Sequence, residues 1–227
     1  MFSQILQILF VVVLVVAVPM MSHSTARKPE IHTLPRGALY FSATVSQWIL
    51  VAIAIAVVLA TRMHLRDLGF RGAALAPSLD WALGLTLVSS AGLLAVVLLE
   101  RRGWWPPESE LVYLLLPETR QEKVWCVLLV APTAGLCEEF LYRGFVMGAF
   151  FRAGLPGWLV VLFSSVLFGM AHLYQGRSGF LGTSILGLIF ATARIAYHSV
   201  APVMVWHAVV DVVAGVAGPR YLFRGKT

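Results

Sequence analysis

The sequence predicts an all-α fold, a polytopic bundle of about seven or eight transmembrane helices. Hydrophobic residues make up 59% of the 227 residues and charged residues only 12%, whereas a soluble domain has roughly 45–50% and about 25%. Seven apolar stretches also have lengths near the roughly 20 residues that a spanning helix needs. They cover about residues 4–21, 40–61, 80–99, 124–150, 157–173, 180–198 and 200–217. This composition excludes a disordered chain and an ordinary cytosolic enzyme.

The first stretch favours a retained helix over a cleaved signal peptide. Its apolar run has a suitable length for a signal peptide, and small residues follow it at 22–26. However, residues 1–4 contain no Lys or Arg, which the start of a signal peptide requires. We therefore expect this stretch to stay in the protein as its first helix.

The second to seventh stretches differ in whether they are long enough to span a membrane. The second, third, fourth and sixth are long enough, whereas the fifth and seventh are at the short end. Turn residues lie at 154–157, 176–179 and 218–219 and separate or end the last three stretches. The segment 104–118 is ambiguous, because its two Trp residues suit the headgroup level but its apolar run is too short to span alone. If this segment does span, the protein has eight helices.

The basic residues predict the orientation in the membrane. The net charge is +6, but the 17 Lys and Arg residues are scattered through short loops, whereas a nucleic-acid-binding protein would gather them on one face. With seven spans and an outside N-terminus, eleven of them lie inside, five, including Arg152 and Arg194, lie outside, and Arg143 lies within the membrane. Eight spans give nine against seven. Both models place the C-terminal tail inside, so we expect a cytoplasmic C-terminus and no nucleic-acid partner.

Six ionisable residues lie inside or at the end of predicted spans. Each costs at least about 2.5–3.5 kcal/mol at the centre of a helix on insertion scales, so such residues usually face the bundle interior or a cavity and mark function. The interiors of the first three stretches contain none. The six are Glu138, Glu139, Arg143, His172, His207 and Asp211. The sequence therefore predicts a functional cavity built from residues 138–211.

Helical spacing separates the two adjacent carboxylates. Glu139 and Arg143 are four residues apart, so they share a helix face and can form an ion pair. Glu138 is rotated by about 100° from Glu139 and points to a different sector. It is then the free carboxylate, which suits a general base that activates water. His207 and Asp211 also share a face, and we expect Asp211 to fix the tautomer of His207.

The same residues leave the cofactor question open. Two His and one or more carboxylates from three helices could hold a divalent metal such as zinc, or could activate water and polarise a carbonyl without one. The candidate ligands are Glu138, His172, His207 and Asp211. An HExxH helix, which would be a strong zinc signal, does not occur in the sequence.

Three motifs on these stretches resemble the CPBP family, the CAAX proteases and bacteriocin-processing enzymes also called the Abi family. Residues 138–144, EEFLYRG, resemble its EExxxR motif, and residues 168–172, FGMAH, resemble its FxxxH motif. Residues 207–211, HAVVD, resemble its third motif, in which Asn or Asp follows His by four residues. The motifs occur in the family's order, each on an apolar stretch, and the resemblance covers roughly residues 108–217.

The resemblance implies an intramembrane endopeptidase, a hydrolase whose catalytic core covers 108–217. Together with N-terminal helices over 1–107 and a short basic tail over 218–227, this core forms one integral membrane domain. Carried over motif by motif, the resemblance makes Glu138 the base that activates water. It places His172 beside Glu138, places His207 and Asp211 on the oxyanion side, and gives Glu139 and Arg143 a supporting role.

Asp211 departs from the eukaryotic members, which have Asn at this position. An ionised Asp cannot donate a hydrogen bond to an oxyanion. Asp211 would therefore have to be protonated, bind a metal or act through His207. The family has been described both as metallopeptidases and as metal-independent glutamic peptidases, and the sequence leaves both mechanisms open.

Two other functions share these features. A non-catalytic membrane scaffold or a bacteriocin self-immunity protein would keep the same fold. A transporter would also place ionisable groups in the membrane, but it would commonly show inverted repeats, and the sequence shows none. For the peptidase, the expected partners are the lipid bilayer and a peptide or protein substrate that is lipidated or carries a leader. The Ala-, Val- and Arg-rich composition favours a bacterial inner membrane.

Overall fold

The computed structural model describes residues 2–70, 75–107 and 109–222. Throughout these residues the chain forms helices joined by short turns, and it contains no strand. The predicted all-α fold is therefore confirmed.

Seven long helical segments make up most of the described chain. The first comprises α1 (Phe2–Val12), the π-helical turn η1 (Val13–Ala17) and α2 (Val18–Ala26), and α3 (Arg36–Ala60) and α4 (Leu75–Arg101) follow. The fourth is the continuous helix Arg120–Arg152. It contains α6 (Arg120–Trp125), η3 (Cys126–Val130), α7 (Ala131–Glu139), η4 (Phe140–Val146) and α8 (Met147–Arg152). The last three are α9 (Gly157–Ala171), α10 (Gly176–Ala196) and α11 (Ala201–Leu222).

The lengths and composition of these helices suit a membrane. Five described segments are long and apolar enough to cross one, namely Phe2–Ala26, Arg36–Ala60, Leu83–Arg101, Arg120–Arg152 and Leu173–Ala196. Gly157–Ala171 and Ala201–Ala217 are shorter apolar helices, as the fifth and seventh stretches predicted. Large apolar side chains point outward from several helices, for example Leu59, Leu87 and Leu128, each 72% exposed. Such a surface is stable when lipid covers it.

The segment before residue 120 does not form an eighth span. It contains α5 (Glu110–Leu115), which at six residues is about 9 Å long, far short of the roughly 30 Å hydrocarbon core. Trp105 instead donates Nε1–H to Ser178 Oγ over 2.8 Å, which ties the segment to the start of α10. The described residues therefore support the seven-span alternative.

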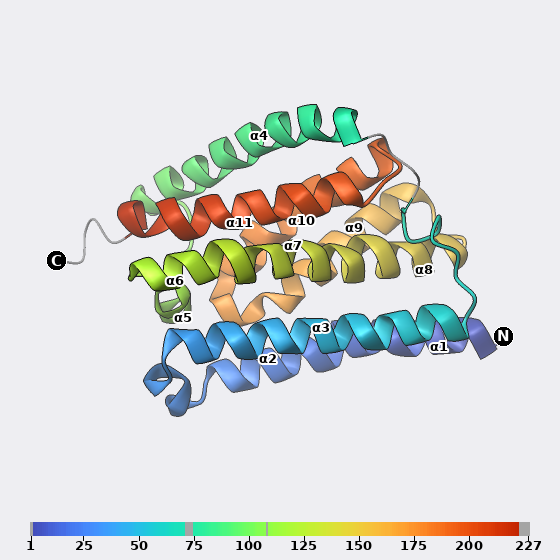
Figure 1. Cartoon of the computed structure of the whole chain (residues 1–227), viewed down its shortest axis with the longest axis horizontal. Helices are drawn as coiled ribbons and strands as arrows, with labels where there is room; N and C mark the ends of the chain where they lie inside the picture. The colour runs from blue at the N-terminus through green and yellow to red at the C-terminus, as the bar shows by residue number, and fades with distance from the viewer. Residues whose placement is uncertain (1, 71–74, 108, 223–227) are drawn as a thin grey trace.

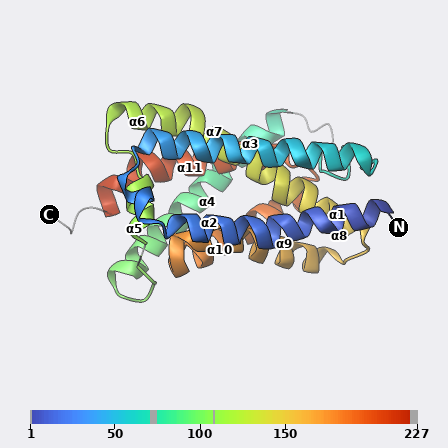
Figure 2. The same ribbon diagram turned by 90° about the horizontal axis from the view of Figure 1, so that it is seen from below.

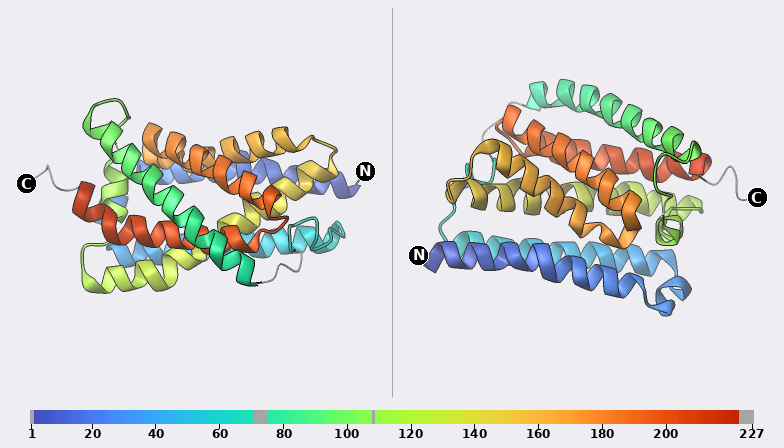
Figure 3. Two further views of the ribbon diagram at one scale, coloured as in Figure 1. Left: turned by 90° about the horizontal axis from the view of Figure 1, so that it is seen from above. Right: turned by 180° about the vertical axis from the view of Figure 1, so that it is seen from behind.

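The helix α7 lies between α3 and α11 in the bundle (Figure 1). Figure 1 shows α1, α2 and α3 along one side of the bundle and α4 along the opposite side, with α7 and α11 between them. The view from behind in Figure 3 shows α9 and α10 on the other face. Contacts join α7 to α3 and to α11, and α9 to α10. From below, α3 runs beside α7 (Figure 2), and α2 and η1 contact α9.

Two of the three π-helical turns have an identifiable cause. Pro19 is the second residue of α2 and Pro132 the second residue of α7, and each of these two helices directly follows a π-helical turn. A proline has no N–H, and its ring clashes with the carbonyl four residues before it; a wider turn relieves that clash. The third turn, η4, contains no proline. It begins directly after Glu139 and contains Arg143, two of the predicted site residues.

Two glycines allow the helices that carry the site to approach closely. A Cβ on Gly135 of α7 would lie 2.5 Å from the carbonyl oxygen of Met204 on α11. A Cβ on Gly169 of α9 would lie 2.8 Å from the carbonyl oxygen of Phe180 on α10. Because only glycine lacks a Cβ, these backbone distances require glycine at both positions. The close approach of α7 and α11 brings their polar side chains together.

Candidate active site

The six predicted ionisable residues meet inside the bundle. Two end α7, one lies in η4, one follows α9 directly and two lie on α11. Their burial differs: the side chains of Glu139 and Arg143 are fully buried, and that of Asp211 is 35% exposed. The side chains of Glu138, His172 and His207 are between 8% and 15% exposed. The cluster therefore has a sealed interior and a partly accessible side.

One oxygen of Glu139 organises the sealed interior. Arg143 donates Nη1–H to Oε1 over 2.9 Å, which confirms the predicted ion pair. His207 donates Nδ1–H to the same oxygen over 2.8 Å. Arg143 also donates Nη2–H to the carbonyl of Gly187 on α10, 3.2 Å away, and its guanidinium lies 4.1 Å from the ring centre of Phe168. This buried network links α7, η4, α9, α10 and α11.

The ring of His207 is fixed by Glu139 and not by Asp211, so the prediction from sequence is wrong on this point. A carboxylate at Nδ1 places the ring proton there and leaves Nε2 directed at the other carboxylates. Asp211 Oδ2 lies 3.6 Å from Nε2 of His207, beyond hydrogen-bond distance. The reason is that sequence spacing identifies neighbours on one helix only, whereas the close approach of α7 and α11 brings Glu139 nearer.

Glu138 lies between two imidazole rings. Its Oε2 is 3.7 Å from Nε2 of His172 and 3.9 Å from Nε2 of His207. His172 donates Nδ1–H to the carbonyl of Phe168 over 2.9 Å, so its Nε2 carries the lone pair. Oε2 of Glu138 is buried and has no hydrogen-bond partner among the described residues. One carboxylate oxygen is thus free to accept a proton beside two ring nitrogens.

Gln47 on α3 is a site residue that the sequence reasoning missed. It donates Nε2–H to Oε1 of Glu138 over 2.8 Å, and its own Oε1 is buried without a partner among the described residues. The signal in the sequence is a carboxamide within the apolar stretch 40–61. Spacing along the chain does not pair this carboxamide with Glu138, because the two residues lie on different helices. Gln47 holds one oxygen of Glu138 and leaves the other oxygen available.

Arg194 is a buried residue of a helix, so the expectation that it lies in an outside loop is corrected. It lies in the last turn of α10 and is only 9% exposed. Its Nε–H reaches the carbonyl of Arg143 over 3.2 Å, and its Nη2–H reaches the carbonyl of Asp67 over 3.0 Å. The side chain turns inward because these backbone carbonyls offer acceptors there.

The arrangement does not form a metal site. Among the residues that the structure describes, no group of three or more His, Cys, Asp or Glu could hold a metal ion. Glu138 Oε2 lies 3.7 Å and 3.9 Å from the two Nε2 atoms, whereas two zinc ligands at ordinary bond lengths are about 3.3 Å apart. The candidate ligands Glu138, His172, His207 and Asp211 therefore do not fit a metal as they are placed.

Comparison with known proteins identifies this region. Residues 120–213 match the family model described as type II CAAX prenyl endopeptidase Rce1-like. The match runs from α6 into α11 and contains all six ionisable residues, which confirms the resemblance that the three motifs predicted. Gln47 lies outside it. No curated protein and no solved structure matches the chain.

Proposed function

Because residues 120–213 carry the domain of the CAAX protease family, we propose that the protein is an intramembrane endopeptidase that uses water activated by Glu138. The observation that carries this proposal is the free Oε2 of Glu138, which faces Nε2 of both His172 and His207. A carboxylate in this position can act as general base on a water held by the neighbouring ring nitrogens. The buried network behind it keeps the rings in place.

The proposed reaction proceeds by addition and elimination. Glu138 takes one proton from a water that also donates to Nε2 of His172, and the water oxygen attacks the carbonyl carbon of the scissile peptide bond. The C–N bond then breaks, and the proton held by Glu138 passes to the leaving nitrogen. One water is consumed, and a carboxylic acid and an amine are formed, so Glu138 returns to its starting state.

His207 is placed to stabilise the tetrahedral intermediate. Its Nδ1 is held by Glu139, so a second proton on Nε2 would make the ring an imidazolium that donates to the oxyanion. Glu139 and Asp211 lie on opposite sides of the ring and compensate that positive charge. In this scheme Asp211 acts through His207 and does not itself donate to the oxyanion, which accounts for an Asp at this position.

A comparison of peptide ends tests the proposal. Cells would express wild type or Glu138→Gln at matched levels, and the ends of membrane-protein peptides would be compared by mass spectrometry. We expect a cleavage product with wild type that falls at least about 100-fold with Glu138→Gln, since loss of a general base costs about 10²–10⁴-fold. Glu30→Gln, an exposed carboxylate outside the site, is the matched control and should leave the product unchanged.

The same experiment separates the peptidase from a scaffold or self-immunity protein. A scaffold would keep its phenotype with Glu138→Gln and His172→Ala but lose it with Gly148→Leu. A Cβ on Gly148 would lie 2.8 Å from the carbonyl oxygen of Asp67, so a larger side chain disrupts packing. Identical peptide ends with wild type and Glu138→Gln would overturn the peptidase proposal. The comparison also identifies the substrate, whether prenylated protein, leader peptide or membrane-protein fragment.

A further inference from the structure

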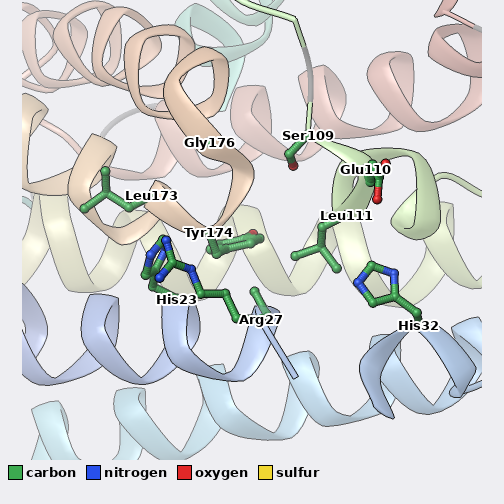
Figure 4. A pocket seen from close by; sticks show the side chains of 10 residues that line it. His23, Arg27, His32, Ser109, Glu110, Leu111, Leu173, Tyr174 and Gly176 are labelled. Atoms are coloured by element: carbon green, nitrogen blue, oxygen red, sulfur yellow. The ribbon is translucent and has the colours of Figure 1, made fainter. Parts of the chain in front are cut away.

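Two hollows lie at the end of the bundle that holds the α2–α3 turn, α5 and the start of α6. The first, a pocket of about 280 Å³, is lined mainly by α2, α5 and the turn η5 (Leu173–Gln175) (Figure 4). It lies beside His172, because Tyr174 lines it and stacks on the His172 ring with centroids 5.9 Å apart. The second, a groove of about 310 Å³, lies on the outer face of α6 and η3.

The groove follows one face of this helix. Its lining residues are spaced by three and four positions, so they lie one above another. They are Arg120, Lys123, Val124, Val127 and Leu128. Val124 and Leu128 are 47% and 72% exposed. The groove is therefore cationic at the end of the helix and apolar below it, over about 12 Å at 1.5 Å per residue.

The acidic residues nearest the groove are bound elsewhere. Glu118 accepts two hydrogen bonds from Arg36 on α3, over 2.7 Å and 3.2 Å. Glu122 caps the start of its own helix and lies 3.9 Å from the same guanidinium. Arg120 and Lys123 make no ion pair with another residue that the structure describes. The groove thus offers two positive charges that no described carboxylate neutralises.

The length of the helix places these charges at the membrane surface. Arg120–Arg152 has 33 residues and is about 50 Å long, whereas the hydrocarbon core is roughly 30 Å thick. Because a charged residue stands at each end, the first turn lies at the level of the lipid headgroups. Arg120 and Lys123 are among the basic residues that the seven-span model places inside. The leaflet on that side carries the anionic lipids.

We propose that this groove binds an anionic phospholipid of the cytoplasmic leaflet. Its phosphate lies between Arg120 and Lys123, because charge-assisted hydrogen bonds from a guanidinium and an ammonium suit a phosphate. One of its acyl chains covers the three aliphatic side chains below. A second protein chain fits less well, since a stable interface takes roughly 20–30 residues from each partner and five residues of one helix face form the groove.

The binding test is native mass spectrometry of the purified full chain. Its micelles would be supplemented with phosphatidylglycerol or with phosphatidylcholine that carries the same acyl chains. Each basic residue near anionic lipid contributes about fivefold in affinity, so we expect the first phosphatidylglycerol to bind roughly 25-fold more tightly than phosphatidylcholine. Arg120→Gln combined with Lys123→Gln should remove this preference and leave the binding of phosphatidylcholine unchanged.

Two further variants separate the groove from a general charge effect. Arg27→Gln combined with Lys28→Gln removes the same charge from the same end of the bundle but outside the groove, and should keep the preference. Val124→Trp keeps both groove cations and fills the apolar part, so it should weaken binding of the first phosphatidylglycerol.

Three results would overturn the inference: equal affinity of the two lipids, an equal loss with the Arg27 and Lys28 pair, or unchanged binding with Val124→Trp. Glycerol phosphate that displaces phosphatidylglycerol at equal concentration would also overturn it, because the site would then recognise a free anion and no acyl chain. Lipid binding is measured without cleavage, so its failure leaves the peptidase proposal untouched. Peptide ends that do not depend on Glu138 would in turn leave the lipid groove untouched.

Discussion

At the residue scale, the site depends on a single buried oxygen of Glu139 that accepts hydrogen bonds from Arg143 and His207. A buried ion pair contributes little net stability, because desolvation opposes the Coulombic attraction, but removing one partner leaves a charge uncompensated. The network therefore specifies the position of His207 more than it stabilises the fold. This distinction separates variants that unfold the protein from those that only displace the ring.

The first prediction concerns Arg143. Arg143→Leu leaves Glu139 buried without its cation and should lower the free energy of unfolding by about 3–5 kcal/mol. The measurement is a reversible SDS titration of the purified protein in micelles. Arg120→Leu, which removes an exposed arginine at the start of the same continuous helix, should leave the unfolding midpoint unchanged. Equal midpoints for the two variants would show that Arg143 does not compensate Glu139.

The second prediction concerns Gln47, which we assign as a positioning residue. Gln47→Leu removes the hydrogen bond to Oε1 of Glu138 and should lower kcat roughly tenfold, the effect of about 1.4 kcal/mol, with KM unchanged. Gln121→Leu removes an exposed carboxamide away from the site and serves as the control. A purely structural role would instead lower the unfolding midpoint together with the amount of active protein. A change in KM alone would contradict the assignment.

At the element scale, helix separation decides the geometry of the site. α7 and α11 can approach because Gly135 has no side chain, and this approach brings Glu139 to His207. η4 carries Arg143, and Arg194 on α10 ties the backbone of η4 to that of Asp67. The side chains of the candidate site are thus positioned by backbone contacts between helices. A small addition at such a contact should affect the site more than a large change on the lipid-facing surface.

The third prediction compares two glycines. Gly135→Ala places a methyl group 2.5 Å from the carbonyl oxygen of Met204, so α7 must move away from α11. We expect a loss of about 1–3 kcal/mol in the free energy of unfolding and a clear loss of product. Gly92→Ala on α4 meets nothing within 4 Å and should be neutral or stabilising by up to about 1 kcal/mol. Equal effects of the two substitutions in the same titration would contradict this account.

At the scale of the whole molecule, the two ends of the bundle differ in charge. The α2–α3 turn, the end of α4, α5 and the start of α6 lie at one end of the bundle (Figure 1). These segments hold seven basic residues, Arg27, Lys28, Arg36, Arg101, Arg102, Arg120 and Lys123, whereas four described ones lie toward the opposite end, Arg62, Arg66, Arg152 and Arg194. From the positive-inside rule we propose that the end with the 280 Å³ pocket faces the cytoplasm. A substrate would reach Glu138 from that side, and the C-terminus would also be cytoplasmic.

The fourth prediction tests this orientation. Lys28→Cys and Arg66→Cys place one exposed thiol at each end of the bundle. With a membrane-impermeant maleimide on intact spheroplasts, Arg66→Cys should be labelled directly and Lys28→Cys only after permeabilisation. The two native cysteines, Cys126 and Cys137, are free and buried, so they add little background. Labelling in the reverse order would invert the topology.

The limits of prediction from sequence are visible in single residues. The pair Glu139–Arg143 was predictable, since four-residue spacing on one helix fixes which side chains are neighbours. The partner of His207 was not, because it lies on another helix, and spacing along the chain carries no information about distances between helices. Gln47 and the inward turn of Arg194 were missed for the same reason.

The sequence by itself determined the helical membrane class, the order of the spans, the six ionisable residues and the family that their motifs indicate. These properties depend on composition and on spacing along one helix, and both are given by the amino-acid sequence itself. Only the tertiary structure decided that α5 does not span, that Glu139 holds His207, that Gln47 holds Glu138, and that a pocket lies beside His172. Each of these depends on how closely separate helices pack, and that distance is set by contacts between residues far apart in the chain.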